Sequence, residues 1–197
     1  PEELARKRRE QNWDELPNYS RYVRVNLLEQ EGADHARLRR LVAAALSPKL
    51  IGNLRGRIQA QVEELLSGVV AKQRMDFLED LAVPLPVSVI AALLGWPADE
   101  RHRLRPWSAR IVRLYEKDHS AEDRTRAETA ASQFAAALDK LAETRRADPR
   151  DDLISAMVSI HDQGDRITRD EPPHQSNLSF VYVPAVASSI PCIFSHR

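Results

Sequence analysis

The chain has 197 residues, with 29 Lys and Arg against 29 Asp and Glu, so its formal net charge is zero. A neutral chain lacks the bulk electrostatic attraction that draws strongly basic proteins to nucleic acids or anionic membranes, so neither is predicted as a partner. Hydrophobic residues make up 43% and charged residues 29% of the chain, as in ordinary globular proteins. The single cysteine, Cys192, excludes an intramolecular disulfide and a multi-cysteine metal cage, and it fits a cytoplasmic protein.

The charged residues end abruptly near position 171. Between positions 172 and 197 only Arg197 is charged, and four of the twelve prolines lie there. The apolar stretch over 178–194 contains two of these prolines and is short for a membrane-spanning helix, so no membrane span is predicted. We therefore expect a helical domain over residues 1–171 and an irregular, low-charge tail over residues 172–197.

Two helices are predicted between residues 34 and 70. Asp34 is a suitable N-cap for the first helix. Pro48 stands directly after Ser47 and suits the first turn of the second helix, which extends to about Val70. Apolar residues recur at the spacing of one helix face in both. These residues are Leu38, Leu41, Val42 and Ala45 in the first helix, and Ile51, Leu54, Ile58, Val62, Leu65, Leu66 and Val69 in the second.

Shorter elements and a long helix follow. Residues 75–78 fit a short strand or a turn. Residues 86–94 form a nearly all-apolar helix that ends at Gly95, so we expect it to be buried on most sides. Ser120 and Asp123 make a capped start for a long helix. Two further helices are predicted over residues 104–114 and 151–162. The fold class is therefore mainly α.

Near residue 171, where the charged residues end, the sequence both starts a helix and breaks it. Thr168 and Glu171 form the capping box that announces a helix. Pro172 and Pro173 follow at once, and Pro173 removes an intrahelical hydrogen bond and restricts the residue before it. Because this conflict coincides with the change in composition, we interpret residues 172–197 as a segment joined to the natural sequence, for instance by a frameshift.

One pair of cationic residues is a candidate binding site. His35 and Arg39 are four residues apart, so on a helix they lie one turn apart on the same flank of the apolar face, whereas Arg40 points to solvent. Cationic donors beside a buried face suit a carboxylate or phosphate at the edge of an apolar pocket. The alternative interpretation is a basic, solvated helix face.

Other chemistry finds little support in the sequence. The six histidines never share a helix turn with a carboxylate in a zinc-binding pattern, so no metal site is predicted. Ser108 and Ser155 lack the context of a nucleophile elbow. No catalytic residue is therefore assigned from the residues alone.

Three segments resemble the bacterial cytochromes P-450, the haem-thiolate monooxygenases. Residues 31–48 resemble the C helix and its continuation, residues 76–97 the stretch entering the E helix, and residues 151–168 the H helix and the approach to the I helix. They stand in the order of the family and cover much of residues 25–171. The resemblance implies an incomplete cytochrome P-450-like helical fold that runs from the C to the H helix.

The resemblance also implies a cofactor and partners. In that family the C-helix His and the Arg four residues later contact the haem propionates, which implies haem held by His35 and Arg39. It further implies a small organic substrate, and a ferredoxin-type electron donor that docks near the exposed side of this helix, which includes Arg37 and Arg40. The loop that often touches substrate corresponds to Val25, Asn26, Leu27 and Leu28.

The chain departs from the family after residue 168. Pro172 and Pro173 stand where the I helix should carry an Ala-Gly-x-x-Thr core, and the K-helix Glu-x-x-Arg pair is missing. Cys192 lacks the flanking glycines of the loop that supplies the haem thiolate. We therefore predict a marginally folded chain that does not catalyse monooxygenation alone. The alternative is a non-enzymatic helical module that binds an acidic ligand or partner through the same cationic pair.

Overall fold

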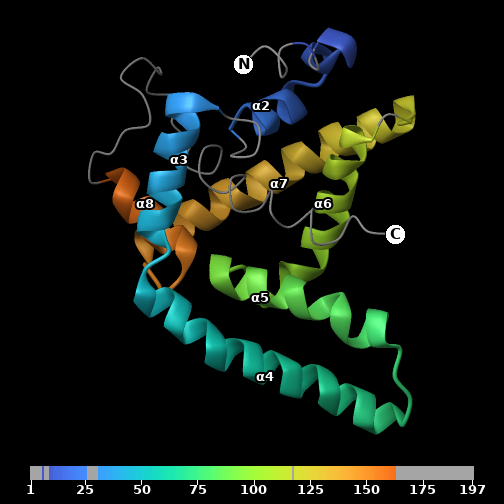
Figure 1. Ribbon diagram of the computed structural model, residues 1–197, viewed down its shortest axis with the longest axis vertical. Helices are drawn as coiled ribbons and strands as arrows, with labels where there is room; N and C mark the ends of the chain where they lie inside the picture. Colours follow the sequence, from blue (N-terminus) through green and yellow to red (C-terminus); the bar gives the residue numbers. More distant parts are fainter. Residues whose placement is uncertain (1–5, 7–8, 26–30, 117, 163–197) are drawn as a thin grey trace.

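The computed structural model describes Arg6 and residues 9–25, 31–116 and 118–162, and within these ranges every regular element is a helix (Figure 1). The mainly α fold class is confirmed. In chain order the elements are η1 (Trp13–Glu15), α2 (Pro17–Val25), α3 (Gly32–Ala45), α4 (Pro48–Lys72), η3 (Leu78–Ala82), α5 (Pro84–Leu94), η4 (Ala98–Arg103), α6 (Leu104–Val112), η5 (Arg113–Tyr115), α7 (Ala121–Ala147) and α8 (Leu153–Asp162).

The long helix α7 is the element around which the others are arranged. It crosses the middle of the molecule and packs against α2, α6 and α8 (Figure 1). The helix α3 packs on α8, and α4 runs beside α5 at one edge of the molecule. The helix that carries the candidate cationic pair is therefore joined to the centre through α8.

Two helices begin where the sequence predicts. The Ser47 side chain accepts a hydrogen bond from the Leu50 amide (3.2 Å), and Pro48 opens α4. At α7 the Ser120 hydroxyl accepts from the Asp123 amide (3.1 Å), and the Asp123 carboxylate accepts from the Ser120 amide (2.9 Å). These bonds satisfy amides that have no partner within the helix, which is why the capping sequences mark helix starts.

The predicted N-cap of α3 is wrong by three residues. The helix begins at Gly32, with Glu31 at the N-cap, whereas Asp34 lies inside the helix. Gly32 has a φ of +60°, a conformation that costs little only for glycine. The backbone freedom of Gly32 thus decides the start, and an N-cap preference at Asp34 does not.

The segment between α4 and α5 contains no strand. Asp76 Oδ1 instead accepts hydrogen bonds from the amides of Leu78 (3.0 Å) and Glu79 (3.1 Å), which begins the single π-helical turn η3. Asp80 Oδ2 accepts from the Asp76 amide in return (2.8 Å). Reciprocal side-chain bonds therefore hold this turn, and the strand alternative for residues 75–78 is excluded.

The helix α5 starts earlier and is less buried than predicted. It begins at Pro84 rather than Pro86, and only Ala91 and Leu94 are buried, while its other residues are half-buried. Gly95 closes it in the left-handed region with φ +71°, as predicted. Its described neighbours are α4, η3, η4 and α8, and they leave part of its apolar surface in contact with solvent.

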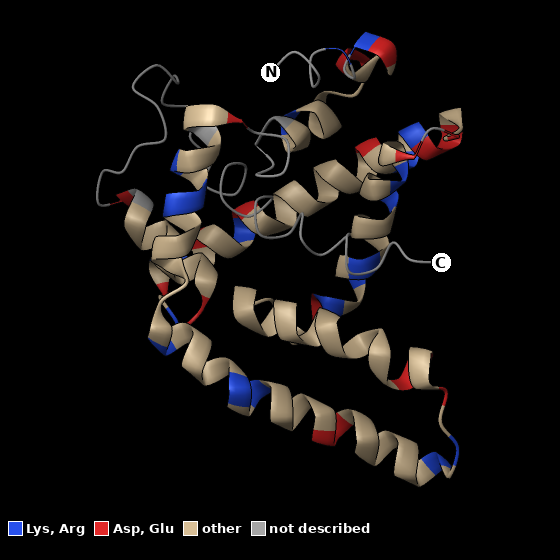
Figure 2. Ribbon diagram, viewed as in Figure 1, with Lys and Arg blue, Asp and Glu red and all other residues tan. Residues whose placement is uncertain are grey.

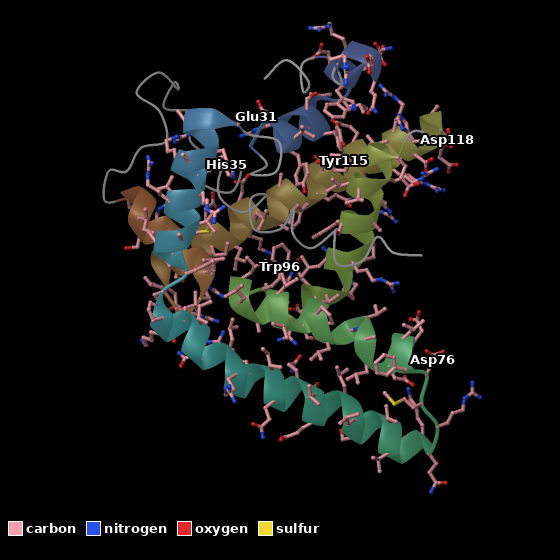
Figure 3. All side chains as sticks on the ribbon, viewed as in Figure 1. Glu31, His35, Asp76, Trp96, Tyr115 and Asp118 are labelled. Atoms are coloured by element: carbon pink, nitrogen blue, oxygen red, sulfur yellow. The ribbon has the colours of Figure 1, made fainter. Side chains whose placement is uncertain are left out.

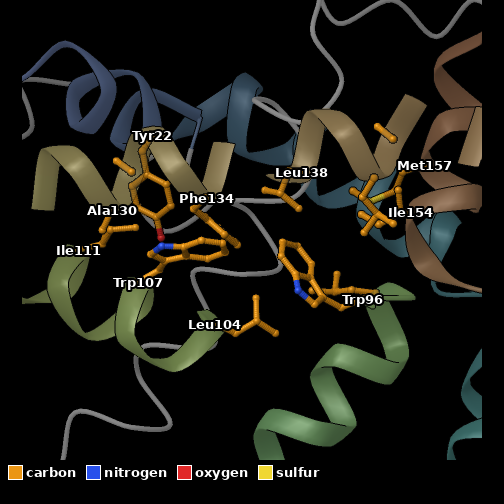
Figure 4. Close-up of a cluster of buried hydrophobic side chains, with 14 of the residues drawn as sticks. Tyr22, Trp96, Leu104, Trp107, Ile111, Ala130, Phe134, Leu138, Ile154 and Met157 are labelled. Carbon is orange, nitrogen blue, oxygen red and sulfur yellow. The ribbon is translucent and has the colours of Figure 1, made fainter. Parts of the chain in front are cut away.

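The centre of the molecule is an aromatic cluster between α6 and α7. The ring centroids of Trp96, Trp107 and Phe134 lie 6.0 to 6.2 Å apart (Figure 4). Such ring pairs add about 0.5–1.5 kcal/mol beyond the burial of their area. Apolar residues along one face of α6 and η5, and along one face of α7, are buried. These residues are Leu104, Trp107, Ile111 and Leu114, and Ala127, Ala131, Phe134, Leu138 and Leu141.

The sequence did not predict α2, which a residue of α7 caps. Glu128 accepts hydrogen bonds from the amides of Asn18 (2.9 Å) and Tyr19 (2.9 Å), in the first turn of α2. The Asn18 side chain donates a further bond to the same carboxylate (2.6 Å). Trp13 and Tyr19 are fully buried beneath this contact. A carboxylate at a helix amino terminus also meets the positive end of the helix dipole.

Within residues 9–25, 31–116 and 118–162, no helix is both long and apolar enough to cross a bilayer. The same residues contain no group of three His, Cys, Asp or Glu side chains placed to hold a metal ion.

Candidate functional site

The helix α3 presents cationic side chains beside a buried apolar face. Leu38, Leu41 and Ala45 are buried and pack the helix onto α8. His35 lies in the amino-terminal half of α3 (Figure 3) and is half-buried. Arg39, one turn later, is exposed. Both flank the buried face, as their spacing requires.

The donors of this pair are open to a ligand. Neither the His35 ring nor the Arg39 guanidinium makes a hydrogen bond or ion pair with another described residue. A guanidinium offers a planar fork of five N–H donors that matches a carboxylate, and an imidazole adds a further donor. The geometry of α3 therefore suits an anionic group placed along this flank.

Arg37 does not lie on an exposed side of α3, and this part of the sequence interpretation is wrong. Its side chain is half-buried, and its Nη1 atom is buried without a hydrogen-bond partner in the described part of the chain. Arg40 is exposed, as predicted. A buried guanidinium nitrogen without a partner is costly, so this atom adds a second donor position in need of an acceptor.

A buried ion pair holds the helix on which α3 rests. Arg145 of α7 and Asp152, just before α8, have side chains only 6% and 4% exposed, and they are joined by a salt bridge. Asp152 also accepts a hydrogen bond from the Ser155 amide (2.8 Å), which caps α8. The Arg145 Nη2 atom donates to the Gly95 carbonyl oxygen (2.6 Å). One cluster therefore fixes α5, α7 and α8 together.

Gly95 fits this cluster for two reasons. Its φ of +71° lies in the left-handed region that favours glycine. A Cβ at this position would also stand 2.0 Å from Asp152 Oδ2, far inside van der Waals contact. The backbone of Gly95 can thus approach the ion pair only because the residue has no side chain.

The comparisons with known proteins place this arrangement in a family. No family model matches the chain. Nocardicin C N-oxygenase from Nocardia uniformis is 37% identical over 147 residues, which cover 74% of this chain and 35% of that protein. The crystal structure of CalO2 superposes with a TM-score of 0.75 at 30% identity, over 88% of this chain and 41% of that chain. The chain belongs to the bacterial cytochrome P-450 family.

Only part of a cytochrome P-450 is present in the chain. It spans 35% and 36% of the length of two other curated relatives that it matches. A further solved structure, cytochrome P-450 BioI in complex with an acyl carrier protein that bears hexadec-9Z-enoic acid, superposes with a TM-score of 0.70 at 26% identity. That match covers 91% of this chain and 47% of the other. The expected incomplete cytochrome P-450-like fold is therefore confirmed.

Haem, which the cytochrome P-450 family implies, can be tested against the residues of α3. Its carboxylates need cationic donors at the edge of an apolar pocket, and His35 and Arg39, on one flank of α3 beside its buried face, are donors of that kind. The donor set therefore fits the haem carboxylates. Its iron needs a thiolate in this family. Cys192, the single cysteine, lies outside the described residues.

Other residues singled out in the sequence are placed only in part. Val25 is the last residue of α2, but nothing of its side chain is described. Asn26, Leu27 and Leu28 lie outside the described residues, so the predicted substrate loop stays a prediction. The same holds for the boundary at residue 171 and the tail over 172–197, including the proposed frameshift.

A basic groove between α6 and α7 was not predicted from the sequence. It is a hollow of about 610 Å³, and the cationic segment beside it is visible along α6 (Figure 2). Residues 101–115 contain five arginines and no acidic residue, a bias that could have revealed it in a chain of zero net charge. The residues lining this α6–α7 groove are Glu100, His102, Arg103, Pro106, Trp107, Arg110, Gln133, Ala136, Ala137 and Lys140.

Proposed function

We propose that this chain carries the part of a cytochrome P-450 monooxygenase that holds the haem carboxylates, and that His35 and Arg39 are the residues that bind them. The single observation that carries the proposal is the pair of cationic side chains on α3, one turn apart and without a partner among the described residues, in a chain of this family. Arg37 is two residues from each of them and lies on the opposite flank of α3, so it is not part of this pair.

In this proposal His35 and Arg39 bind and orient the haem, and they take no part in the chemical reaction. The Arg39 guanidinium and an N–H of the His35 ring would each hold a haem carboxylate by hydrogen bonding. Leu38 and Leu41 of α3 anchor the donors because they pack the helix against α8. When bound through a thiolate, haem supplies the oxygen-activating chemistry of the family.

Substrate and electron delivery are proposed on the family resemblance alone. A small organic molecule is the proposed substrate of the whole enzyme, and a ferredoxin-type protein is its proposed electron donor. The exposed guanidinium of Arg40 supports a docking role for the far side of α3. The half-buried Arg37 is better suited to a ligand beneath the helix. A carrier-bound fatty acid is a second substrate form, because the BioI relative was solved with such a complex.

We further propose that the chain does not catalyse monooxygenation by itself. No residue with the sequence pattern of the thiolate loop or the oxygen-activating helix occurs in the 197 residues. Reduced chain incubated with haem should give no carbon-monoxide-shifted Soret band of the thiolate type. The appearance of that band would overturn this part of the proposal.

A haem titration with two forms of the cofactor tests the carboxylate site. The chain is titrated with haem and with haem dimethyl ester, which has the same ring but no free carboxylates, and binding is followed by tryptophan quenching. Haem should bind about tenfold more tightly than the ester, because the two charge-assisted contacts are lost in the ester.

Matched variants assign that difference to residues. The double substitution His35→Ala with Arg39→Ala should abolish the preference for haem over its ester, whereas Arg40→Ala should keep it. Equal binding of haem and ester by the unaltered chain would reject the carboxylate site. The non-enzymatic binding module would then be favoured if the chain still bound acidic ligands through the same pair.

A further inference from the structure

The α6–α7 groove concentrates positive charge away from α3. His102 and Arg103 lie at one end, Arg110 in the middle, and Lys140 comes from α7. A second hollow of about 470 Å³, lined by Ala109, Arg110, Arg113, Asp123 and Arg126, shares Arg110 with the first. The two hollows are therefore neighbouring parts of one basic trough between α6 and α7.

The charges of this trough are only partly neutralised. Arg103 lies 3.7 Å from Glu100, and Arg113 lies 3.6 Å from Asp123. The side chains of Arg110 and Lys140, in contrast, form no ion pair or hydrogen bond with another described residue, and both residues are exposed. Two cations of the trough, one of them Arg110 where the two hollows meet, therefore have side chains without a partner among the described residues.

Part of the lining of the trough is apolar. Pro106, Ala136 and Ala137 line it together with an edge of the buried Trp107 ring. The Trp107 Nε1 atom donates a hydrogen bond to Gln133 Oε1 (2.9 Å), which fixes the ring. Small side chains and a fixed aromatic ring at the base of a groove resemble the sites that receive the apolar face of an amphipathic segment.

We propose that the α6–α7 groove is a docking site for an acidic protein, which inserts an amphipathic helix with its carboxylates toward Arg110 and Lys140. Charge complementarity of this kind steers association and sets register. A protein fits better than a nucleic acid because Glu100 and Asp123 line the same trough and would repel a continuous phosphate backbone. The open, two-part shape is also larger than a single small anion needs.

Binding of designed peptides to the full chain tests the proposal. The probe is a labelled helical peptide of about 20 residues, built from Glu and Leu with Leu at helical spacing. Its counterparts are the same peptide with Lys in place of Glu, and a single-stranded oligonucleotide of similar length. Fluorescence anisotropy at low and high salt should show that the acidic peptide binds, that salt weakens it, and that the basic peptide does not bind.

Two charge-reversed variants of equal net charge locate the site. Arg110→Glu with Lys140→Glu should weaken binding of the acidic peptide about tenfold or more, because like charges then face it. Arg55→Glu with Arg74→Glu, exposed on and just after α4, should leave binding within about twofold. Circular dichroism of both variants verifies that the helices are retained.

Each remaining outcome decides against the proposal. Equal weakening in the two variants would mean that peptide binding follows net charge alone. Tighter binding of the oligonucleotide than of the acidic peptide would identify a nucleic-acid site. Absence of binding by the unaltered chain, with its helices intact, would show that the trough is a solvated surface. None of these results depends on haem, so the haem titration can fail or succeed separately.

Discussion

A single buried guanidinium decides much of the packing between α7 and α8. Replacing Arg145 with Ala leaves the 4% exposed Asp152 side chain without its counter-charge. Removing one partner of a buried pair costs about 3–5 kcal/mol, which is a large share of the stability of a small domain. We expect urea denaturation to show this loss, or an unfolded chain. The matched control is Arg146→Ala, whose pair with Asp162 is exposed and should cost less than about 1 kcal/mol.

A second residue, Asp139 of α7, links stability to pH. Burial raises the pKa of this carboxyl above its usual 3.8, although the nearby Arg21 opposes the shift. A carboxyl that holds its proton more tightly in the folded state loses stability as pH rises through the raised pKa. Asp139→Asn should therefore raise the melting temperature at pH 7 and have little effect below pH 3.8. A lower melting temperature at pH 7 would mean that attraction to Arg21 outweighs burial.

At the scale of elements, the capping box of α7 is the clearest test. Ser120→Ala removes the hydroxyl that accepts from the Asp123 amide, and loss of such a cap costs about 0.5–2 kcal/mol. Hydrogen bonds from Ser120 lower the pKa of Asp123. These bonds therefore stabilise the folded chain at neutral pH, and this stabilisation is lost as pH falls through the lowered pKa. The loss in free energy of unfolding caused by Ser120→Ala, measured by urea denaturation, should therefore be greatest near neutral pH. Ser132→Ala, in the exposed middle of α7, should be neutral or slightly stabilising.

Elements whose signals are local could be predicted from the sequence, and those decided by distant residues could not. Ser47 and Ser120 cap α4 and α7 through amides three residues away, so the signal and its effect lie together. The start of α2 depends instead on Glu128, about 110 residues away in the chain. A single sequence carries no local sign of that contact, and the helix was not predicted.

In the candidate site, too, local spacing could be predicted from the sequence, and contacts between distant residues could not. Helical spacing alone brings His35 and Arg39 to one flank of α3, which the structure reproduces. The burial of Arg37 depends on what covers the helix, so the family resemblance wrongly placed this residue on the exposed side. The salt bridge between Arg145 and Asp152 joins a helix to the segment after it, where only the tertiary turn brings the charges together.

At the scale of the molecule, the most unusual feature is apolar surface without cover. Val70, Phe77 and Leu78, at the end of α4 and in η3, are 75%, 62% and 62% exposed. We name this the α4–η3 face. In the relatives the matched region is only 35% to 36% of the protein, so the remaining chain offers surface that can cover such a face. Exposed apolar patches commonly mark interaction sites or drive aggregation.

The exposed α4–η3 face should make the chain associate with itself. The 197-residue chain should bind a hydrophobic dye and associate as its concentration rises, because burial of about 25 cal/mol per Å² of apolar area favours contact between copies. Phe77→Asp with Leu78→Asp should lower both dye fluorescence and the apparent mass in light scattering. Ala43→Asp with Ala44→Asp, on the exposed side of α3, adds the same charge and should change neither. A monomeric, dye-free chain would mean that this face is covered in solution, since its apolar side chains cannot be left bare without cost.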